Sequence, residues 1–503
     1  MRVKLAAALL LVALGLAGCG AGAGDPSGAS PAQLAPAKSL VYVELTVRPE
    51  GAQRTAVESA LTRLLGHSPD AGIQRLAGKL FGHAGLNYSG DVAPWLGQRV
   101  GIVVTKFSRA GLGLIAPTTD PAAALKTFRQ VLHVQLKSAA YAGIHYQECV
   151  DPTDRFALGK VGGNAVIAAP AVFRGIVDAY HGRSLSKASA FGSAFSAVPG
   201  TPLIRAYVNA SGVGAALRTL LHQSRPNDVL PPSLQQLYGA ALAKLHGTLG
   251  LSLTAAPHAL TVAIHSSAAH SGHGGDVGSL PEQSWLALAT GAFNLRPIEH
   301  ALGTELGRNP SMQLALSHVR AKLGLSLLHD ILPALGPLEL SFQGTSALAV
   351  AGGLVIHPSN LPAAGRVVAA IHRLLSRSAS LSVQGSRHNF TITKRGLPIP
   401  RVVVTETGGK VVVTVDESPA QALAPPTHLS ASPRFAAARS QLPAGSRIPL
   451  FIDFRGLGQL LQGLPNFAGP HDQGILGVLG RLDYLVVGSS QSHGDLRLVL
   501  ALR

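Results

Sequence analysis

The order of apolar and polar residues along the chain predicts short strands interspersed with amphipathic helices. Leu40–Val47 is rich in β-branched residues, whereas Ala56–Leu65 and Ala122–Leu132 space their apolar residues as a helix does. Two apolar runs separated by Ala-Pro-His, Leu249–Ala255 and Ala259–His265, predict a hairpin. Because strands mostly follow strands in pairs, the pattern favours an α+β fold with a largely antiparallel sheet over a doubly wound parallel sheet.

Two long stretches of the chain match each other without a gap. Leu185–Leu221 can be laid on Leu429–Pro465 at a constant offset of 244, the difference between 429 and 185, and eleven of the 37 positions are identical. Composition alone would give roughly three identities. Within the first stretch, Pro202–Asn209 predicts a strand, and Ser211 is the expected cap of the helix that follows it.

The same correspondence holds further upstream in the chain. Asp91–Gly97 matches Asp330–Gly336, in which Asp, Pro, Leu and Gly stand in register at an offset of 239. Pro36–Val43 lines up with Pro281–Leu288 at an offset of 245. Three separated blocks at nearly the same offset indicate that one unit is present twice.

The repeat predicts two homologous α+β domains, each a largely antiparallel sheet with packed helices. The first repeat covers residues 36–265, and the second covers residues 280–503. The segment between them, residues 266–279, is rich in Ser, Gly and His and is a linker by composition.

The beginning of the chain has the pattern of an export signal. Met1–Lys4 is short and cationic, and the apolar stretch Leu5–Leu16 follows it without a charge. A helix of this length rises about 18 Å, which is too short to cross the roughly 30 Å hydrocarbon layer of a bilayer. We therefore expect residues 1–18 to be a signal peptide.

The signal ends in Leu16-Ala17-Gly18-Cys19, which resembles the bacterial lipobox. The resemblance implies that Cys19 is acylated and that the chain is cleaved after Gly18. Residues 19–35 would then be a flexible tether, and the protein would lie on the extracytoplasmic face of the cell membrane as a lipid-anchored protein. The alternative is an ordinary cleaved signal followed by a chance cysteine.

The composition indicates a folded, basic protein. Of the 503 residues, 47% are hydrophobic and 13% are charged, and the formal net charge is +17. Anionic lipids, cell-wall polymers or other envelope proteins are the expected partners, although the charge could also serve only the solubility of the surface. Nucleic acid is not expected, because the basic residues are scattered and aromatic residues make up only 5% of the chain.

The candidate chemistry in the sequence is weak. Ser184-Leu185-Ser186-Lys187 matches the S-x-x-K motif of penicillin-recognising enzymes, but the matched residues of the second repeat, His428–Ala431, lack both the serine and the lysine. His265, His270 and His273 with Asp276 could hold a metal only loosely, because the last three lie in the predicted linker and His265 directly precedes it. The sequence therefore predicts no catalytic residue, no metal site and no cofactor.

Two further residues need an interpretation. Trp95, beside Pro94, is a candidate binding aromatic, and packing of a turn is the alternative. Cys149 would have no disulfide partner if Cys19 is acylated, and a partly buried structural thiol is expected there.

Several of these features together resemble a bacterial, mainly actinobacterial, family known as domain of unknown function 3352. They are the lipobox, the opening strand and helix from Leu40 to Gln53, the Asp91-x-x-Pro94-Trp95-Leu96-Gly97 signature and the block that begins at Leu185. The resemblance implies an exported or membrane-attached protein without an established activity. It supplies no catalytic residue, and Ala334 replaces the tryptophan in the second repeat.

The leading hypothesis is a membrane-tethered lipoprotein that acts as a non-enzymatic binding or scaffold protein of the cell envelope. A second hypothesis is a carrier of lipids or other apolar ligands, with a cleft between the repeats. A third is a cell-envelope hydrolase that uses Ser184 or another nucleophile.

Overall fold

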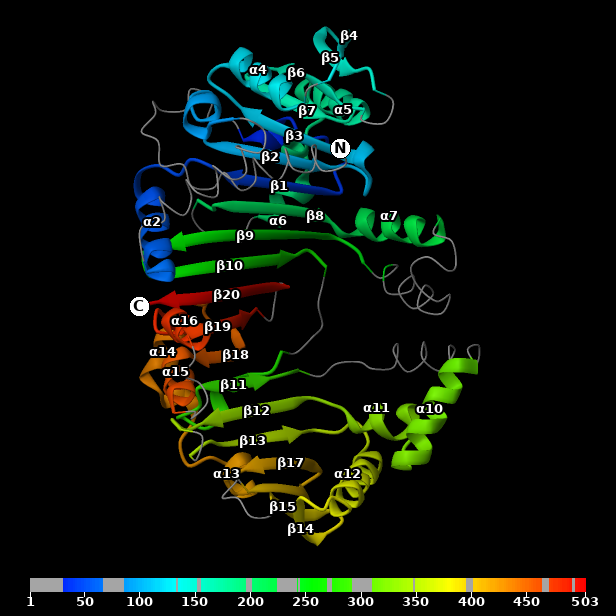
Figure 1. Cartoon of the computed structure of the whole chain (residues 1–503), viewed down its shortest axis with the longest axis vertical. Helices are drawn as coiled ribbons and strands as arrows, with labels where there is room; N and C mark the ends of the chain where they lie inside the picture. The colour runs from blue at the N-terminus through cyan, green and yellow to red at the C-terminus, as the bar shows by residue number, and fades with distance from the viewer. Residues whose placement is uncertain are drawn as a thin grey trace. The chain divides into compact units, whose positions relative to one another are not determined.

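The structure is a computed structural model of the chain (Figure 1). It describes residues 30–66, 86–132, 134–151, 155–195, 201–223, 242, 245–268, 274–291, 310–346, 349–394, 401–463, 470–490 and 494–503. Within these ranges, every helix is too short or too polar to cross a bilayer.

The described chain forms two compact units, the first ending at residue 268 and the second beginning at residue 274. The strands of the first unit are β1 (Val41–Thr46), β2 (Arg99–Val104), β3 (Leu112–Pro117), β4 (Leu136–Tyr141), β5 (Ile144–Cys149), β6 (Ala157–Val161), β7 (Asn164–Ala168), β8 (Ile204–Asn209), β9 (Thr248–Ala256) and β10 (Ala259–Ser266). Its helices and turns are η1 (Pro31–Gln33), α2 (Gly51–Leu65), η2 (Tyr88–Val92), η3 (Arg109–Gly111), α4 (Pro121–Leu132), α5 (Pro170–Tyr180), η4 (Leu185–Lys187), α6 (Ser189–Ala194) and α7 (Ala210–Gln223).

The second unit contains a similar set of elements. Its strands are β11 (Leu286–Ala289), β12 (Leu338–Gln343), β13 (Ala351–Ile356), β14 (Leu381–Ser386), β15 (Asn389–Lys394), β16 (Val402–Thr407), β17 (Lys410–Val415), β18 (Arg447–Asp453), β19 (Leu482–Ser489) and β20 (Asp495–Leu502). Its helices and turns are η5 (Val277–Ser279), α10 (Pro310–Leu323), η6 (Leu327–Ile331), α11 (Leu332–Ala334), α12 (Leu361–Ser376), α13 (Pro419–Leu423), η7 (Leu429–Ala431), α14 (Pro433–Ser440), α15 (Phe454–Gln462) and α16 (Pro470–Leu479).

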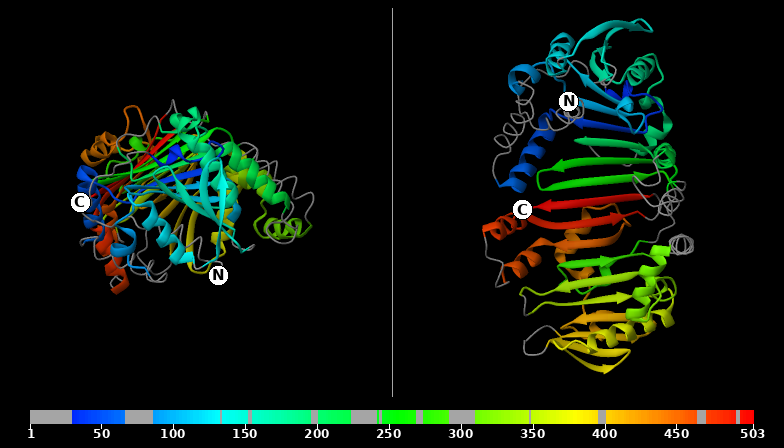
Figure 2. Two further views of the ribbon diagram at one scale, coloured as in Figure 1. Left: turned by 90° about the horizontal axis from the view of Figure 1, so that it is seen from above. Right: turned by 45° about the vertical axis from the view of Figure 1, so that its right-hand side comes forward.

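Each unit is built on one antiparallel sheet, as the succession of strands predicts, and the strands of each sheet run side by side in Figure 2. In the first unit the strand order is β4–β5–β6–β7–β3–β2–β1–β8–β9–β10. In the second unit it is β14–β15–β16–β17–β13–β12–β11–β18–β19–β20, which is the same order in corresponding strands. The mixture of helices with antiparallel strands confirms the α+β class.

The register of the central strands also agrees between the units. Val41 of β1 pairs with Val208 of β8. The sequence repeat matches these two residues to Leu286 and Ile452, and those residues pair with each other between β11 and β18. The isolated bridge between Pro36 and Ser184 likewise has a counterpart, between Pro281 and His428.

Both folded units begin earlier than the sequence predicts. Ala32 and Ala35, which the sequence predicts to lie in the tether, are buried at 1% and 0% exposure, and the Ala35 carbonyl accepts a hydrogen bond from the backbone N–H of Leu185. Val277, which the sequence predicts to lie in the linker, is fully buried. The Leu280 carbonyl accepts from the backbone N–H of Leu429 in the same manner. Short turns that follow polar segments are therefore part of the packed structure in both units.

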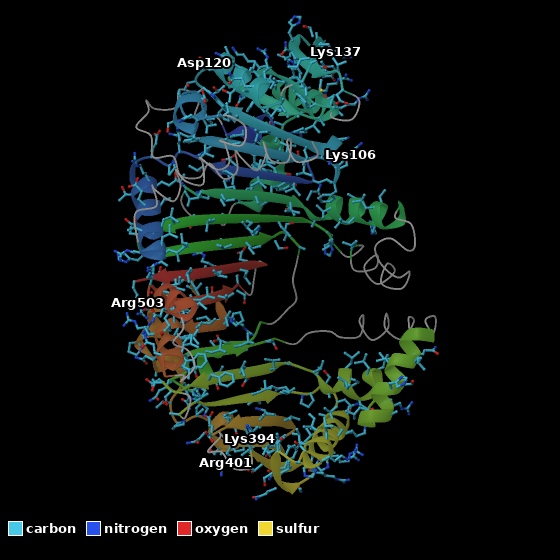
Figure 3. All side chains as sticks on the ribbon, viewed as in Figure 1. Lys106, Asp120, Lys137, Lys394, Arg401 and Arg503 are labelled. Atoms are coloured by element: carbon cyan, nitrogen blue, oxygen red, sulfur yellow. The ribbon has the colours of Figure 1, made fainter. Side chains whose placement is uncertain are left out.

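Local polar side chains begin the helices. Asp120 Oδ1 accepts the backbone N–H groups of Ala122 and Ala123, both at 3.0 Å, and so starts α4 (Figure 3). At α7 the sequence prediction is wrong, because Asn209 and not Ser211 provides the cap. Asn209 Oδ1 accepts the backbone N–H of Gly212 at 2.9 Å, which lets the helix start directly after β8.

The hydrophobic core of the first unit lies on both sides of its sheet. On one side, Leu45 and Leu114 pack with Phe128 of α4. On the other side, Tyr42 and Ile115 pack with residues of α5, η4 and the N-terminal turn η1. Sheet residues buried on both faces explain why β3 and β7 read as continuous apolar runs.

Gly101 lets the N-terminal turn lie close to the sheet. A Cβ atom at this position would stand 2.7 Å from Pro31 Cβ and 3.2 Å from Tyr42 Cε2. We expect Gly101→Ala to lower the free energy of unfolding by about 1–3 kcal/mol, because the turn would have to move from a packed site. Denaturant unfolding of the purified protein measures this change.

Gly163 is the matched control for this substitution. A Cβ atom there would have no neighbour within 4 Å. Gly163→Ala is therefore expected to leave the unfolding midpoint nearly unchanged, and equal losses in the two variants would contradict the packing role assigned to Gly101.

Candidate functional site

The central strands of the first unit carry aliphatic side chains on one face and mostly polar or small ones on the other. Successive side chains of a strand alternate between faces, and paired residues of neighbouring strands share a face. The aliphatic face includes Val41, Val43, Leu45, Ile204, Ala206, Val208, Leu249, Leu251, Leu253, Ala255, Leu260, Val262 and Ile264, and Ser266 pairs with Leu249 on the same face. The opposite face includes Glu44, Arg205, Ser252, Thr254, Thr261 and His265.

The aliphatic face of the first unit is only partly covered. Leu45 and Ser266 are buried at 5% and 8% exposure, and Val43 and Ile204 pack against the core around Leu45. The other residues of the face are partly exposed. An antiparallel sheet normally packs its apolar face on the core and turns its polar face to water. Here Ser252 on the polar side is buried at 1% exposure, whereas its neighbours Leu251 and Leu253 on the aliphatic side are partly exposed.

Two helices border this face. Gln53 of α2 donates from Nε2 to the Thr201 carbonyl, three residues before β8, and Arg63 of α2 lies 3.4 Å from His258 in the turn between β9 and β10. The helix α2 thus runs along one end of β8, β9 and β10, as Figure 1 shows. At the other end of β8, α7 begins at the next residue.

The second unit has the corresponding face. It includes Leu286, Leu288, Leu338, Leu340, Phe342, Leu354, Ile356, Leu450, Ile452, Leu485, Val487, Leu496, Leu498 and Leu500. Val487 is buried at 9% exposure, and the others are partly exposed. A partly exposed aliphatic surface of this kind favours contact with hydrocarbon, because removing it from water contributes about 25 cal/mol per Å².

Trp95, the candidate binding aromatic, lies in the core and is 2% exposed. Its indole ring packs edge-on against Phe128 with 5.6 Å between ring centroids. Its Nε1 donates to the Asp91 carbonyl at 2.6 Å and lies 3.2 Å from Thr127 Oγ1. The polar end of the ring is thus occupied by protein groups.

The signature around Trp95 builds a tight turn. Asp91 Oδ2 accepts the backbone N–H of Asn87 at 2.7 Å, and in the second unit Asp330 Oδ2 accepts that of Ser326 at the same distance. This backbone hydrogen bond, followed by the charge of Arg366, lowers the pKa of Asp330. The shared aspartates therefore hold equivalent one-turn helices, η2 and η6.

Ser184, the candidate nucleophile, is 4% exposed and has an extended backbone immediately before the single turn η4. Its Oγ lies 2.9 Å from Ser186 Oγ. Lys187 is exposed. The S-x-x-K mechanism requires serine and lysine on one helical turn with the lysine beside the serine hydroxyl, and this local structure does not provide it.

The remaining candidate residues do not form one site among the described residues. His265 is the last but one residue of β10, and Asp276 caps η5. Cys19, His270 and His273 lie outside the described residues. Among the described residues, no group of three or more His, Cys, Asp or Glu side chains could hold a metal ion. Cys149 is buried at 7% exposure within the core, which agrees with a structural thiol.

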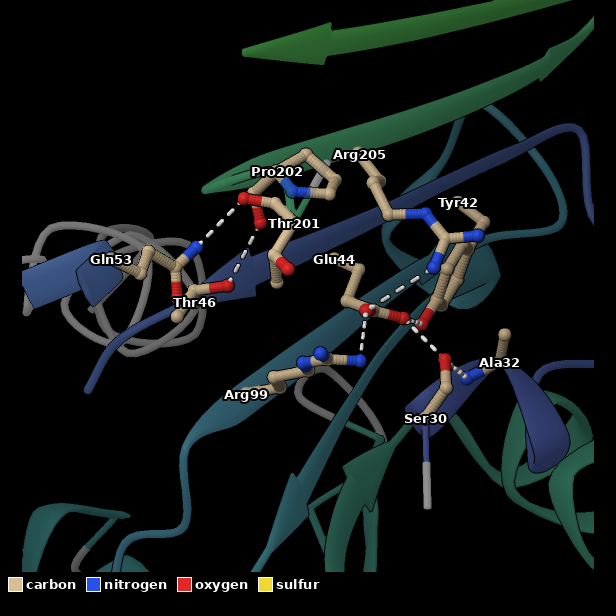
Figure 4. A network of polar contacts seen from close by, with 10 residues as sticks. All are labelled: Ser30, Ala32, Tyr42, Glu44, Thr46, Gln53, Arg99, Thr201, Pro202 and Arg205. Atoms are coloured by element: carbon tan, nitrogen blue, oxygen red, sulfur yellow. Dashed lines mark hydrogen bonds and ion pairs between the residues drawn. The ribbon is translucent and has the colours of Figure 1, made fainter. Parts of the chain in front are cut away.

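Sequence reasoning missed a buried carboxylate at the centre of the first unit (Figure 4). Glu44 is 3% exposed, and its Oε2 accepts from Tyr42 OH at 2.8 Å and from Ser30 Oγ at 2.5 Å. Arg99 Nη1 lies 3.4 Å and Arg205 Nη1 lies 3.8 Å from its Oε1. This network fixes the first described residue of the chain to the central strand.

Burial raises the pKa of Tyr42 well above its ordinary value, and the adjacent charge of Glu44 raises it further. The tyrosine therefore stays a neutral hydrogen-bond donor. Because Glu44 is already surrounded by donors within the protein, this network has the features of a structural clamp.

Glu417 is a second buried carboxylate, in the second unit, and it has no such partners. Its side chain is 6% exposed, and Glu417 Oε2 and the neighbouring Thr414 Oγ1 form no hydrogen bond within the described structure. Burial raises the pKa of Glu417 above its ordinary value of 4.5.

The raised pKa of Glu417 predicts a pH-dependent stability. The folded state binds this proton more tightly than the unfolded state does, so the contribution is present below pH 4.5 and is lost as the pH rises through the folded-state pKa. We expect Glu417→Gln to be more stable than the parent protein at pH 8 but not at pH 4. Thermal unfolding at the two pH values measures the difference, and a constant difference would contradict the assignment.

Comparison with known proteins identifies the family but no activity. The family described as "Protein of unknown function (DUF3352)" matches residues 4–473. No curated protein matches the chain. The solved structure described as crystal form I of TP0453 is similar with a TM-score of 0.25 and 13% sequence identity, over 48% of this chain and 81% of that one, which supports no functional conclusion.

Proposed function

We propose that this chain, which belongs to the DUF3352 family, is a membrane-tethered lipoprotein of the cell envelope that binds the acyl chains of lipids without chemical turnover. The observation that carries the proposal is the partly exposed aliphatic face in each unit. The ligand then lies on the sheet within a unit, and no cleft between the repeats is required.

The physical basis is the match between hydrocarbon and aliphatic side chains. The partly exposed residues of this face in the first unit are all Val, Ala, Leu or Ile. Ser266 on the same face is buried and accepts the backbone N–H of Ala268, so an acyl chain would meet no unpaired polar group there. Each methylene that leaves water contributes about 0.8 kcal/mol when fully buried. An acyl chain of ten or more methylenes therefore gains enough free energy to bind to an open sheet, even if each methylene is only partly buried.

The expected location of the protein at a membrane supports a lipid ligand. The lipobox at Leu16–Cys19 favours an acyl anchor, which would hold the units beside a bilayer that supplies lipid. The strand order and register shared by the two units support a gene duplication of one binding module. We accordingly assign the function to two homologous domains.

The first test of this function is the lipid content of the native protein. Mass spectrometry of protein purified from membranes is expected to find lipid bound to it. The double variant Val208→Thr and Val262→Thr should retain several-fold less lipid, because two hydroxyl groups would be buried under the acyl chain without partners.

Thr261→Val is the control for this experiment, because Thr261 lies on the opposite face beside Val262. Lipid retention should not change in this variant. Protein that carries no lipid under any extraction condition, or an equal loss in the control, would contradict the proposal.

The second test concerns the anchor. Cys19→Ser removes the thiol that acylation needs, and the protein is then expected to move from the membrane fraction to the soluble extracytoplasmic fraction. Mass spectrometry of the parent protein should also find a diacylated amino terminus at residue 19. Unchanged membrane attachment of Cys19→Ser would show that another feature anchors the chain.

A further inference from the structure

The second half of the helix α12 carries apolar side chains that the protein does not bury. The five buried residues of α12 all lie at or before Ala370, and two of them, Ala364 and Val368, pack in one cluster with residues of β15, β16 and β17 (Figure 1). Beyond Ala370, Ile371 and Leu374 are 41% and 53% exposed. Exposed apolar side chains one turn apart are typical of a surface that contacts a partner.

Three arginines run along the same helix. Arg366, Arg373 and Arg377 are spaced by seven and four residues, which places them on one side of the helix, and Leu374 is three residues from Arg377. All three are exposed. Arg366 pairs with Asp330, whereas Arg373 and Arg377 form no ion pair among the described residues.

We call Ile371, Leu374 and these three arginines the basic helix face. The sequence of α12 contains no acidic residue. Its apolar side chains are thus bordered by positive charge alone, which is the pattern of helices that lie in the interface of a membrane.

The part of the chain around α12 is unusually basic. Residues 320–410 include ten Lys or Arg residues and three Asp or Glu residues, so less than a fifth of the chain carries +7 of the net charge of +17. A concentrated positive charge attracts anionic surfaces, and an anionic lipid bilayer presents negative charge above hydrocarbon.

The corresponding helix of the first unit lacks this combination. The helix α4 follows β3 as α12 follows β13, and it packs on the sheet through Ala124 and Phe128. Its exposed side chains include Lys126, Arg129 and Gln130, and no large apolar side chain among its described residues is exposed. The basic helix face is therefore not required by the fold that both units share.

We propose that the basic helix face docks on the surface of an anionic lipid bilayer. Ile371 and Leu374 enter the outer part of the hydrocarbon layer, while the arginines extend to the phosphates of the headgroups. This contact gives the second unit a membrane attachment of its own, in addition to the acyl anchor proposed at Cys19. It does not depend on lipid bound to the aliphatic faces.

Co-sedimentation of the purified full chain with vesicles tests this proposal. The protein carries Cys19→Ser, so that no acyl anchor contributes to binding. Vesicles of phosphatidylglycerol and phosphatidylcholine in equal parts are expected to bind at least about tenfold more tightly than vesicles of phosphatidylcholine alone. Added salt should weaken the binding to the anionic vesicles, because it screens exposed charges.

Two double variants remove the two parts of the basic helix face. Arg373→Gln with Arg377→Gln should lower the affinity for anionic vesicles about tenfold. Ile371→Ser with Leu374→Ser should also lower it about tenfold, because the hydrocarbon contact is lost. All four side chains are exposed, and thermal unfolding checks that the variants remain folded.

Matched controls come from the first unit. Arg54→Gln with Arg183→Gln removes the same charge from two exposed ion pairs. Leu65→Ser with Val150→Ser changes apolar side chains that are 40% and 53% exposed. Both controls should keep the parent affinity, and losses equal to those of the α12 variants would overturn the proposal.

Fluorescence reports whether the helix enters the bilayer. The emission of Leu374→Trp is expected to shift to shorter wavelength when anionic vesicles are added, whereas that of Val150→Trp should not shift. A shift in neither variant, or in both, would overturn the insertion of this helix.

The remaining outcomes separate this inference from the proposed function. Equal binding to both kinds of vesicle, unaffected by the α12 variants, would overturn the docking surface while the acyl-binding function stands. Binding to neither kind would also overturn it and would leave a protein as the partner of this face. The lipid content of the native protein tests the acyl-binding function independently of both results.

Discussion

The strand β1 lies between β2 and β8. Its register with both determines which side chains of these strands lie on each face of the sheet. Val41 pairs with Val104 on one side and with Val208 on the other, so the three strands share one alternation of faces. A shift of register by one residue would exchange the aliphatic and the polar face. It would also turn Glu44 away from the hydroxyl of Ser30. The corresponding strand β11 has the same role between β12 and β18.

Much of this arrangement was predictable from alternation and from the internal match. The hairpin predicted at Leu249–Ala255 and Ala259–His265 is confirmed by the pairing of β9 with β10. The hairpin of β4 and β5 was not predicted, because Leu136–Tyr141 contains small, lysine and serine residues that alternate only weakly. Its strands are defined by their partners in the sheet and not by their own composition.

Less of the candidate sites than of the fold was predictable from the sequence. A sequence pattern marks Leu251 and Val262 as inward-facing strand residues, but only tertiary packing decides whether an apolar face is covered. Glu44 reads as an ordinary strand residue, since its partners Ser30 and Arg205 lie far away in the sequence. Trp95 was open to two interpretations because burial of an indole ring depends on neighbours that the local sequence does not name.

The two units differ in how the entering chain meets the central strand. The offset of 245, extended beyond the matched block Pro36–Val43, places Gly275 at the position of Ser30 and Ala289 at that of Glu44. A Cβ atom on Gly275 would stand 2.4 Å from the Ala289 carbonyl oxygen, so the second unit brings the backbones together where the first uses a charged network. In both units the entering chain thus lies against the central strand, through side chains in the first unit and through close backbones in the second.

The network that binds Ser30 also limits the distance between the folded first unit and the membrane, if the protein is acylated. Cys19 and Ser30 are eleven positions apart, the difference between 30 and 19. A chain of eleven residues spans at most about 40 Å in any conformation. The acyl anchor that we propose at Cys19 would therefore keep Ser30, and with it the edge of the first unit, within that distance of the bilayer surface.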